Sequence, residues 1–139
     1  MAIAGVIAMK PEILILDEPT AGLNPRAHQD ILDMVCHIHE TRKNITLLVS
    51  HNMNDIAALS DRVLVIDHGR LVMNGNPREV FARGEELEAI GLDRPDGMRI
   101  AEALRAEGIP VAGTPITLEE TADGIAEALG LAPAAGEER

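Results

Sequence analysis

ILILDEPTAGLNP, residues Ile13 to Pro25, is the stretch of sequence that decides the fold class of this 139-residue chain. It opens with four branched apolar residues and passes into two adjacent carboxylates, Asp17 and Glu18, followed by Pro19. A short apolar run without polar alternation is typical of a strand buried on both faces of a parallel sheet. Proline ends strand pairing, so the sequence predicts that both carboxylates lie at the carboxyl end of a buried strand.

The segments that follow alternate between helical and strand patterns. In chain order they are a helix over 25–42, a strand over 45–49, a helix over 52–59 and a strand over 63–66. Asn24 and Asn52 precede the two helices and have side chains suited to cap them. Alternation of this kind predicts an α/β fold with a mainly parallel sheet.

The pattern changes after residue 66. We expect a hairpin turn over 67–70, an edge strand over 71–73, and helices over 77–81, 97–107 and from 117 onward. Thr117 and Glu120 form a capping-box pattern. The helix that it starts carries one apolar stripe, which we expect to pack on its own domain: Leu118, Ala122, Ile125 and Leu129.

Composition narrows the classes of function. The formal net charge is -11 and no Lys/Arg cluster occurs, which argues against nucleic acid as a partner. Phe81 is the only aromatic residue, so stacking of bases on rings is not expected. The single Cys36 excludes an intramolecular disulfide and fits a reducing cytoplasm. The apolar residues 1–9 lack the basic region and cleavage site of a signal peptide, and are too few to span a bilayer.

Three polar residues are candidates for chemistry. Asp17 and Glu18 are adjacent, so their side chains diverge at the strand end; one can face a Mg²⁺ held by nucleotide phosphates and the other a water that attacks the γ-phosphate. His51 closes the next strand, and neighbouring ends of parallel strands share the edge where ligands bind. The alternative reading is that Asp-Glu-Pro is only a polar strand end and a turn.

These motifs resemble those of a known family. ILILDEP is similar to the Walker B strand of ABC ATPases, residues 20–25 to the family's D-loop, and His51 to its switch histidine. The resemblance implies an enzyme that uses ATP and Mg²⁺. In it, Asp17 would hold Mg²⁺ through water, Glu18 would be the catalytic base and His51 would sense the γ-phosphate.

The D-loop resemblance extends to the opposing subunit of a dimer. Gly22 and Asn24 stand at positions that the family uses across the dimer interface. The family usually has Asp where Asn24 stands. Asparagine keeps the capping oxygen and drops the charge, so we expect a mild effect on the opposing ATP site.

Two longer stretches of the sequence are similar to those of the energy-coupling-factor ATPases, including the ATPases for cobalt or nickel uptake. They are AGVIAMKPEILILDEPTAGLNP and LVSHNMNDIAALSDRVLVIDHGRLVMNGNPREVF. A weaker match, IGLDRPDGMRIAEALRAEGIP with the TLEE helix, resembles that group's C-terminal extension. The resemblance implies uptake of a metal ion or vitamin at the cytoplasmic face of the cell membrane. The implied partners are a second ATPase subunit, in a homo- or heterodimer, and transmembrane coupling and substrate-binding subunits.

The phosphate-binding pattern G-x-x-x-x-G-K-[ST] does not occur in the sequence, and neither does the LSGGQ signature. Residues 2–5 look like the helix that follows that signature in the family, where a valine is common in place of Met1. We therefore expect a C-terminal fragment, an incomplete P-loop NTPase fold, with no ATPase activity of its own. The resemblance implies that the P-loop strand would lie between those at 45–50 and 62–67, and its absence predicts a gap or a collapsed sheet.

This reading divides the chain into an ATPase part over 1–83, a helical extension over 84–130 and a flexible tail over 131–139. Two alternatives remain. Cys36, His39 and Glu40 share a helix face, but Cys36 and His39 border the apolar stripe and no second ligand cluster follows, which favours a structural role. The chain could also be a non-catalytic binding or regulatory protein that works through its C-terminal helices.

Overall fold

The computed structural model describes residues 11–131. It divides into two compact units, Met1–His51 and Asn52–Arg139. The expected helix at residues 2–5 and most of the expected tail lie outside the described residues. In the described part, no helix combines the length and the apolar character needed to cross a bilayer.

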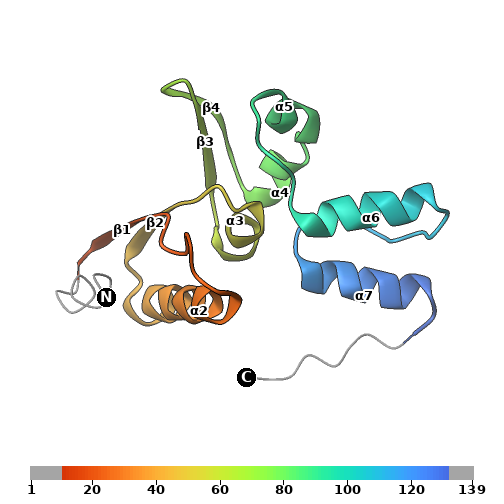
Figure 1. Cartoon of the computed structure of the whole chain (residues 1–139), viewed down its shortest axis with the longest axis horizontal. Helices are drawn as coiled ribbons and strands as arrows, with labels where there is room; N and C mark the ends of the chain where they lie inside the picture. The colour runs from red at the N-terminus through yellow and green to blue at the C-terminus, as the bar shows by residue number, and fades with distance from the viewer. Residues whose placement is uncertain (1–10, 132–139) are drawn as a thin grey trace. The chain divides into compact units, whose positions relative to one another are not determined.

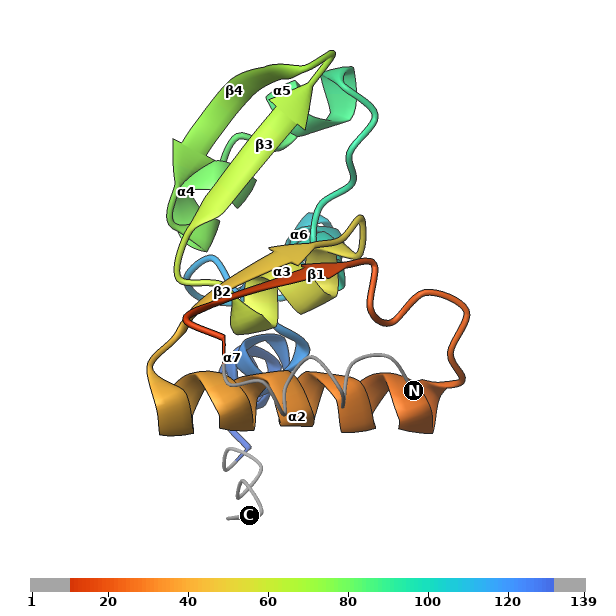
Figure 2. The same ribbon diagram turned by 90° about the vertical axis from the view of Figure 1, so that its left-hand side faces the viewer.

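The first unit is a strand–helix–strand crossover. β1 (Ile13–Asp17) pairs in parallel with β2 (Ile45–Val49), and α2 (Pro25–Arg42) connects them (Figures 1 and 2). The Asn24 side chain accepts a hydrogen bond from the Ala27 N–H at 2.9 Å and caps α2, as predicted. Leu14 and Leu16 of the sheet pack against Val35 and Ile38 of the helix, so α2 covers one face of the strand pair.

The prediction that these strands are buried on both faces is wrong for the described residues. Side chains alternate along a strand, and those that point away from α2 are exposed: Ile13 by 56%, Ile15 by 65%, Ile45 by 63%, Leu47 by 45% and Val49 by 45%. A continuous apolar run shows that both faces suit burial. Such a run does not indicate which element, if any, covers the second face.

The second unit begins with α3 (Met53–Leu59), capped by Asn52 as predicted. β3 (Val63–Asp67) and β4 (Arg70–Gly75) then form an antiparallel hairpin with an irregularity between Val65 and Ile66. The turn places His68 and Gly69 at positive φ. The strands of the described part form two separate two-stranded sheets. The α/β class is confirmed.

In the described part of this unit, four helices follow the hairpin: α4 (Pro77–Phe81), α5 (Gly84–Ala89), α6 (Asp96–Ala106) and α7 (Leu118–Ala128). α6 and α7 lie side by side (Figure 1). Arg105, in the last turn of α6, donates to the carbonyl of Val111 at 2.8 Å and fixes the connection between the two helices. The boundary at residue 83 that the sequence suggested stays a prediction.

The apolar stripe of α7 does not pack as the sequence predicted. Leu118 and Leu129 are each 55% exposed, whereas Thr121 is buried. The reason is the close approach of α6: a Cβ on Gly97 would lie 2.6 Å from Thr121 Oγ1. Because Gly97 has no side chain, the face of α7 that carries Thr121 packs against α6. The face that carries Leu118 stays exposed.

Candidate functional site

The carboxyl ends of β1 and β2 form one edge of the parallel pair. Asp17 is in register with Val49, the last residue of β2. The Glu18 N–H donates to the Val49 carbonyl at 2.8 Å, which extends the pairing by one bond beyond the strand. Both strands therefore deliver their following residues, Glu18 and His51, to the same edge, as the parallel arrangement predicted.

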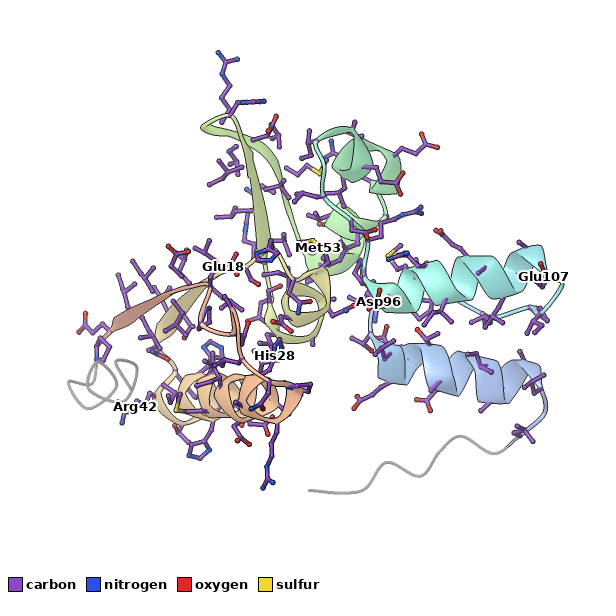
Figure 3. All side chains as sticks on the ribbon, viewed as in Figure 1. Glu18, His28, Arg42, Met53, Asp96 and Glu107 are labelled. Carbon is purple, nitrogen blue, oxygen red and sulfur yellow. The ribbon has the colours of Figure 1, made fainter. Side chains whose placement is uncertain are left out.

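Glu18 and His51 are joined directly at this edge (Figure 3 labels Glu18 at the end of β1). Glu18 Oε1 lies 2.7 Å from His51 Nδ1 and accepts a hydrogen bond from the His51 backbone N–H at 3.0 Å. The Glu18 side chain is 34% exposed and that of His51 81% exposed. Both bonds use Oε1, so the second carboxylate oxygen is not engaged by His51.

The backbone of Glu18 has an uncommon conformation. Its φ is +45°, in the left-handed region that residues with a Cβ rarely adopt. The turn after it is closed by a bond from the Ala21 N–H to the Glu18 carbonyl at 3.2 Å. Strained backbone of this kind gathers at functional sites, and here it turns the Glu18 side chain toward β2.

Asp17 has a different environment from Glu18. It follows the buried Leu16 on β1 and is exposed on the face that α2 does not cover. An exposed carboxylate oxygen suits a Mg²⁺ that keeps part of its water shell. The two adjacent acids thus have separate environments, one in water and one bonded to a histidine.

The segment after Glu18 is a compact loop. Thr20 is buried, the Leu23 N–H donates to the Thr20 carbonyl at 3.3 Å, and Gly22 has a φ of +72°. Gly22 is exposed, and Asn24 uses its side-chain oxygen to cap α2. The exposed loop can meet another surface while its ends stay fixed to β1 and α2.

The alternative metal reading on α2 gains no support from geometry. His39 Nδ1 is 3.1 Å from the Asn44 carbonyl, which gives this ring a structural partner. Burial, with the nearby acids Glu40 and Asp33, raises the pKa of the Cys36 thiol and so disfavours the thiolate that binds metals. Within residues 11–131, no three His, Cys, Asp or Glu side chains gather as a metal site.

Among the contacts between distant residues that the sequence did not predict is one that joins α3 to α6. Asn54 in α3 and Asp96 at the start of α6 exchange two hydrogen bonds across 42 positions of sequence. The only local signal is Pro95, which precedes α6 and carries no side chain able to cap it.

Comparison with known proteins gives consistent relatives, although no family model matches the chain. The energy-coupling factor transporter ATP-binding protein EcfA2 of Caldanaerobacter subterraneus is 49% identical over 125 residues, which are 90% of this chain and 44% of that protein. The protein of the same name from Symbiobacterium thermophilum is 48% identical over 86% of this chain and 41% of its own length. The one from Bacillus subtilis is 42% identical over 88% of this chain and 45% of its length.

A solved structure agrees. The protein cbiO1 of Clostridium perfringens, described as part of the ABC transporter complex cbiONQ, matches with a TM-score of 0.55 and 36% identity, over 75% of this chain and 40% of that one. In sequence and fold the chain is thus similar to the ATP-binding proteins of ABC transporters. Among these, the chain is homologous to the energy-coupling factor transporter ATP-binding proteins. It spans less than half the length of these relatives.

Proposed function

We propose that this chain supplies the water-activating part of the ATP site in a subunit of an energy-coupling-factor importer. The observation that carries the proposal is the bond between Glu18 and His51 at the shared ends of two parallel strands. The relatives that match over most of the chain are named as ATP-binding proteins of such transporters.

Each residue at the edge has a distinct role in this proposal. Mg²⁺ bound to ATP would neutralise charge on the phosphates. Asp17, exposed beside it, would hold the ion through water. Glu18 would orient the attacking water with Oε2, because Oε1 is bonded to His51. His51 would use Nε2 toward the γ-phosphate, since Nδ1 faces Glu18.

The exposed loop suggests how the subunit pairs. Gly22 and Asn24 lie between β1 and α2, and we propose that they face the ATP site of a second ATPase subunit. The remaining partners would be transmembrane coupling and substrate-binding subunits, which would hold the protein at the cytoplasmic face of the membrane. The cargo in this proposal is a metal ion such as cobalt or nickel, or a vitamin.

Phosphate binding is not assigned to these residues. The sequence contains no Gly-Lys pair and hence no lysine-bearing glycine loop. Loss of one charged or polar donor to a transition state typically costs about 10²–10³ in rate. We therefore expect no ATP turnover by the 139-residue chain alone.

A chimera tests the proposal. The part of the Caldanaerobacter relative that the match does not cover is joined to this chain, and ATP turnover is measured. Glu18→Gln should abolish turnover while ATP-driven dimerisation survives. Glu12→Gln, an exposed glutamate next to the opposite end of β1, is the matched control and should leave turnover unchanged. Near-normal hydrolysis by the Glu18→Gln chimera would contradict the assignment.

A second function has one observation in its favour. Leu118 and Leu129 are open on α7, which suits a binding or regulatory protein that docks a partner through its C-terminal helices. Retention of the 139-residue chain on immobilised ATP favours the ATPase subunit. Failure to be retained, together with partner binding that Leu118→Ser and Leu129→Ser abolish, favours the docking role.

A further inference from the structure

The amino terminus of α6 is capped by a residue from another helix. Pro95 occupies the capping position and makes no side-chain bond to the helix. Instead, Asn54 Oδ1 accepts a hydrogen bond from the Asp96 N–H at 2.9 Å. Asn54 Nδ2 in turn donates to Asp96 Oδ2 at 2.7 Å. Asn54 and Asp96 (the latter labelled in Figure 3) are both half-buried. Partial burial strengthens hydrogen bonds to a charged carboxylate such as that of Asp96.

Asn54 is itself fixed from its own side. It is the second residue of α3, and its N–H donates to the capping oxygen of Asn52 at 3.0 Å. An unbroken path of hydrogen bonds therefore runs from Asn52, through Asn54, to Asp96. His51, whose ring bonds Glu18, is the residue just before Asn52.

The first turn of α6 also packs against the start of α7. A Cβ on Gly97 would lie 2.5 Å from the Thr117 carbonyl oxygen, so the two helices touch backbone to backbone at the residue after Asp96. The first turn of α6 is thus the junction of three helices, one of which follows His51 directly in the chain.

We propose that Asn54 and Asp96 are positioning residues, a clasp through which the helices after residue 84 restrain the peptide that carries His51. The proposal rests on the role of His51 in the proposed function. Its physical basis is covalent: only Asn52 and Met53 separate His51 from Asn54. With α3 held to α6, this peptide has few conformations left, and the ring of His51 keeps its bond to Glu18. Without the clasp, α3 moves more freely and the bond is broken more often.

A reciprocal exchange of the two residues tests the clasp. Asn54→Asp places two carboxylates together and removes the donor to Asp96 Oδ2, although an oxygen that can accept from the Asp96 N–H remains. Asn54→Ala removes the bonds without adding charge, and serves if the first variant does not fold. The double variant Asn54→Asp with Asp96→Asn keeps the acceptor for the residue-96 N–H and restores a donor–acceptor pair between the side chains. Asn74→Asp, the same change at an exposed asparagine of β4, is the control.

Two measurements are made on the full chain. Hydrogen exchange of the α3 and α6 amides should accelerate about tenfold in the single variants at residue 54 and return in the double variant. The ¹⁵N shift of His51 Nδ1 should move away from its bonded value in the same variants and also return. The Asn74→Asp control should change neither quantity.

Unchanged exchange in α3 and α6 would show that no clasp exists. Faster exchange with an unchanged His51 signal would show a purely structural contact, and would also overturn the proposal. Neither the hydrogen-exchange rates nor the His51 ¹⁵N shift depends on ATP. Failure of the ATPase assignment would instead appear as turnover by the Glu18→Gln chimera, so the two proposals can fail separately.

Discussion

Gly97 of α6 lies against Thr117, the residue that caps α7: a Cβ added at Gly97 would stand 2.5 Å from the Thr117 carbonyl oxygen and 2.6 Å from Thr121 Oγ1. Real Cβ atoms do not approach backbone this closely. α6 and α7 are therefore joined at a point where one methyl group has no room.

Gly97→Ala should lower the free energy of unfolding by about 1–3 kcal/mol, because the added methyl group forces the helices apart. Gly124→Ala is the control. Its Cβ would meet the Val111 side chain at 3.0 Å, which can give way, and alanine favours the helix. Urea unfolding followed by circular dichroism compares the two. Equal stability of both variants would show that the helices do not meet as described.

Glu18→Gly should be more stable than Glu18→Ala by about 1 kcal/mol, because only glycine adopts a φ of +45° without cost. Both variants lose the carboxylate bonded to His51. The difference between their free energies of unfolding therefore reports the cost of the left-handed backbone conformation alone. Chemical denaturation of the two proteins under one buffer condition gives this difference. If alanine proves as stable as glycine, residue 18 does not hold the left-handed conformation.

Asn24→Ala should destabilise the first unit by about 1 kcal/mol, since the Ala27 N–H loses its acceptor at the start of α2. Asn24→Asp keeps an oxygen at that position, restores the residue usual in the family, and should change stability by only a few tenths of a kcal/mol. Thermal unfolding of the three proteins checks the order. A fully stable alanine variant would contradict the cap.

The pair between Arg78 and Glu120 predicts a pH dependence. Burial acts to raise the pKa of Glu120, but hydrogen bonds from the Ile116 N–H and from Arg78 outweigh it, so the pKa is lowered. A lowered pKa in the folded state gives stability that is present above the unfolded value and lost as pH falls through the folded one.

The advantage of the native protein over Glu120→Gln should thus be present at pH 7 and shrink below about pH 4.5. The side chains are 55% and 38% exposed, so solvent screens the pair and the advantage should stay near or below about 1 kcal/mol. Unfolding free energies of both proteins, measured from pH 7 to pH 3.5, supply the test. A stability advantage of the native protein that grows as the pH falls would contradict this prediction.

The isolated chain should self-associate, because the open face of the β1–β2 pair presents apolar side chains such as Ile15 and Leu47. Light scattering should show mass rising with concentration, and Ile15→Thr with Leu47→Thr should reduce the effect. A sharp two-state melt of a monomer at low concentration would count against this prediction.

Local features of the structure could be predicted from sequence, because their causes are local. Asn24 and Asn52 mark helix starts through their own side chains, and both cap as expected. The meeting of Glu18 and His51 followed from the rule that parallel strands end at one edge. That Oε1 takes both bonds depends on the φ of Glu18, which no residue pattern indicates.

Features that depend on how distant helices pack together could not be predicted. Asn54 and Asp96 are 42 positions apart, and neither position carries a recognisable pattern. The exposure of Leu118 follows from where Gly97 lets α6 and α7 meet, which periodicity within α7 does not encode. Periodicity identifies an apolar face, and the neighbour that fits closest decides which face is used.

Because side chains alternate along β1 and β2, the positions that face α2 and those that face away can be redesigned independently. Polar β-formers at Ile13, Ile15 and Ile45 would leave Leu14 and Leu16 packed as they are. Such a surface-redesigned variant would stay dispersed at the millimolar concentrations that solution NMR requires. The contact between the Glu18 carboxylate and the His51 imidazole could then be followed in the isolated chain.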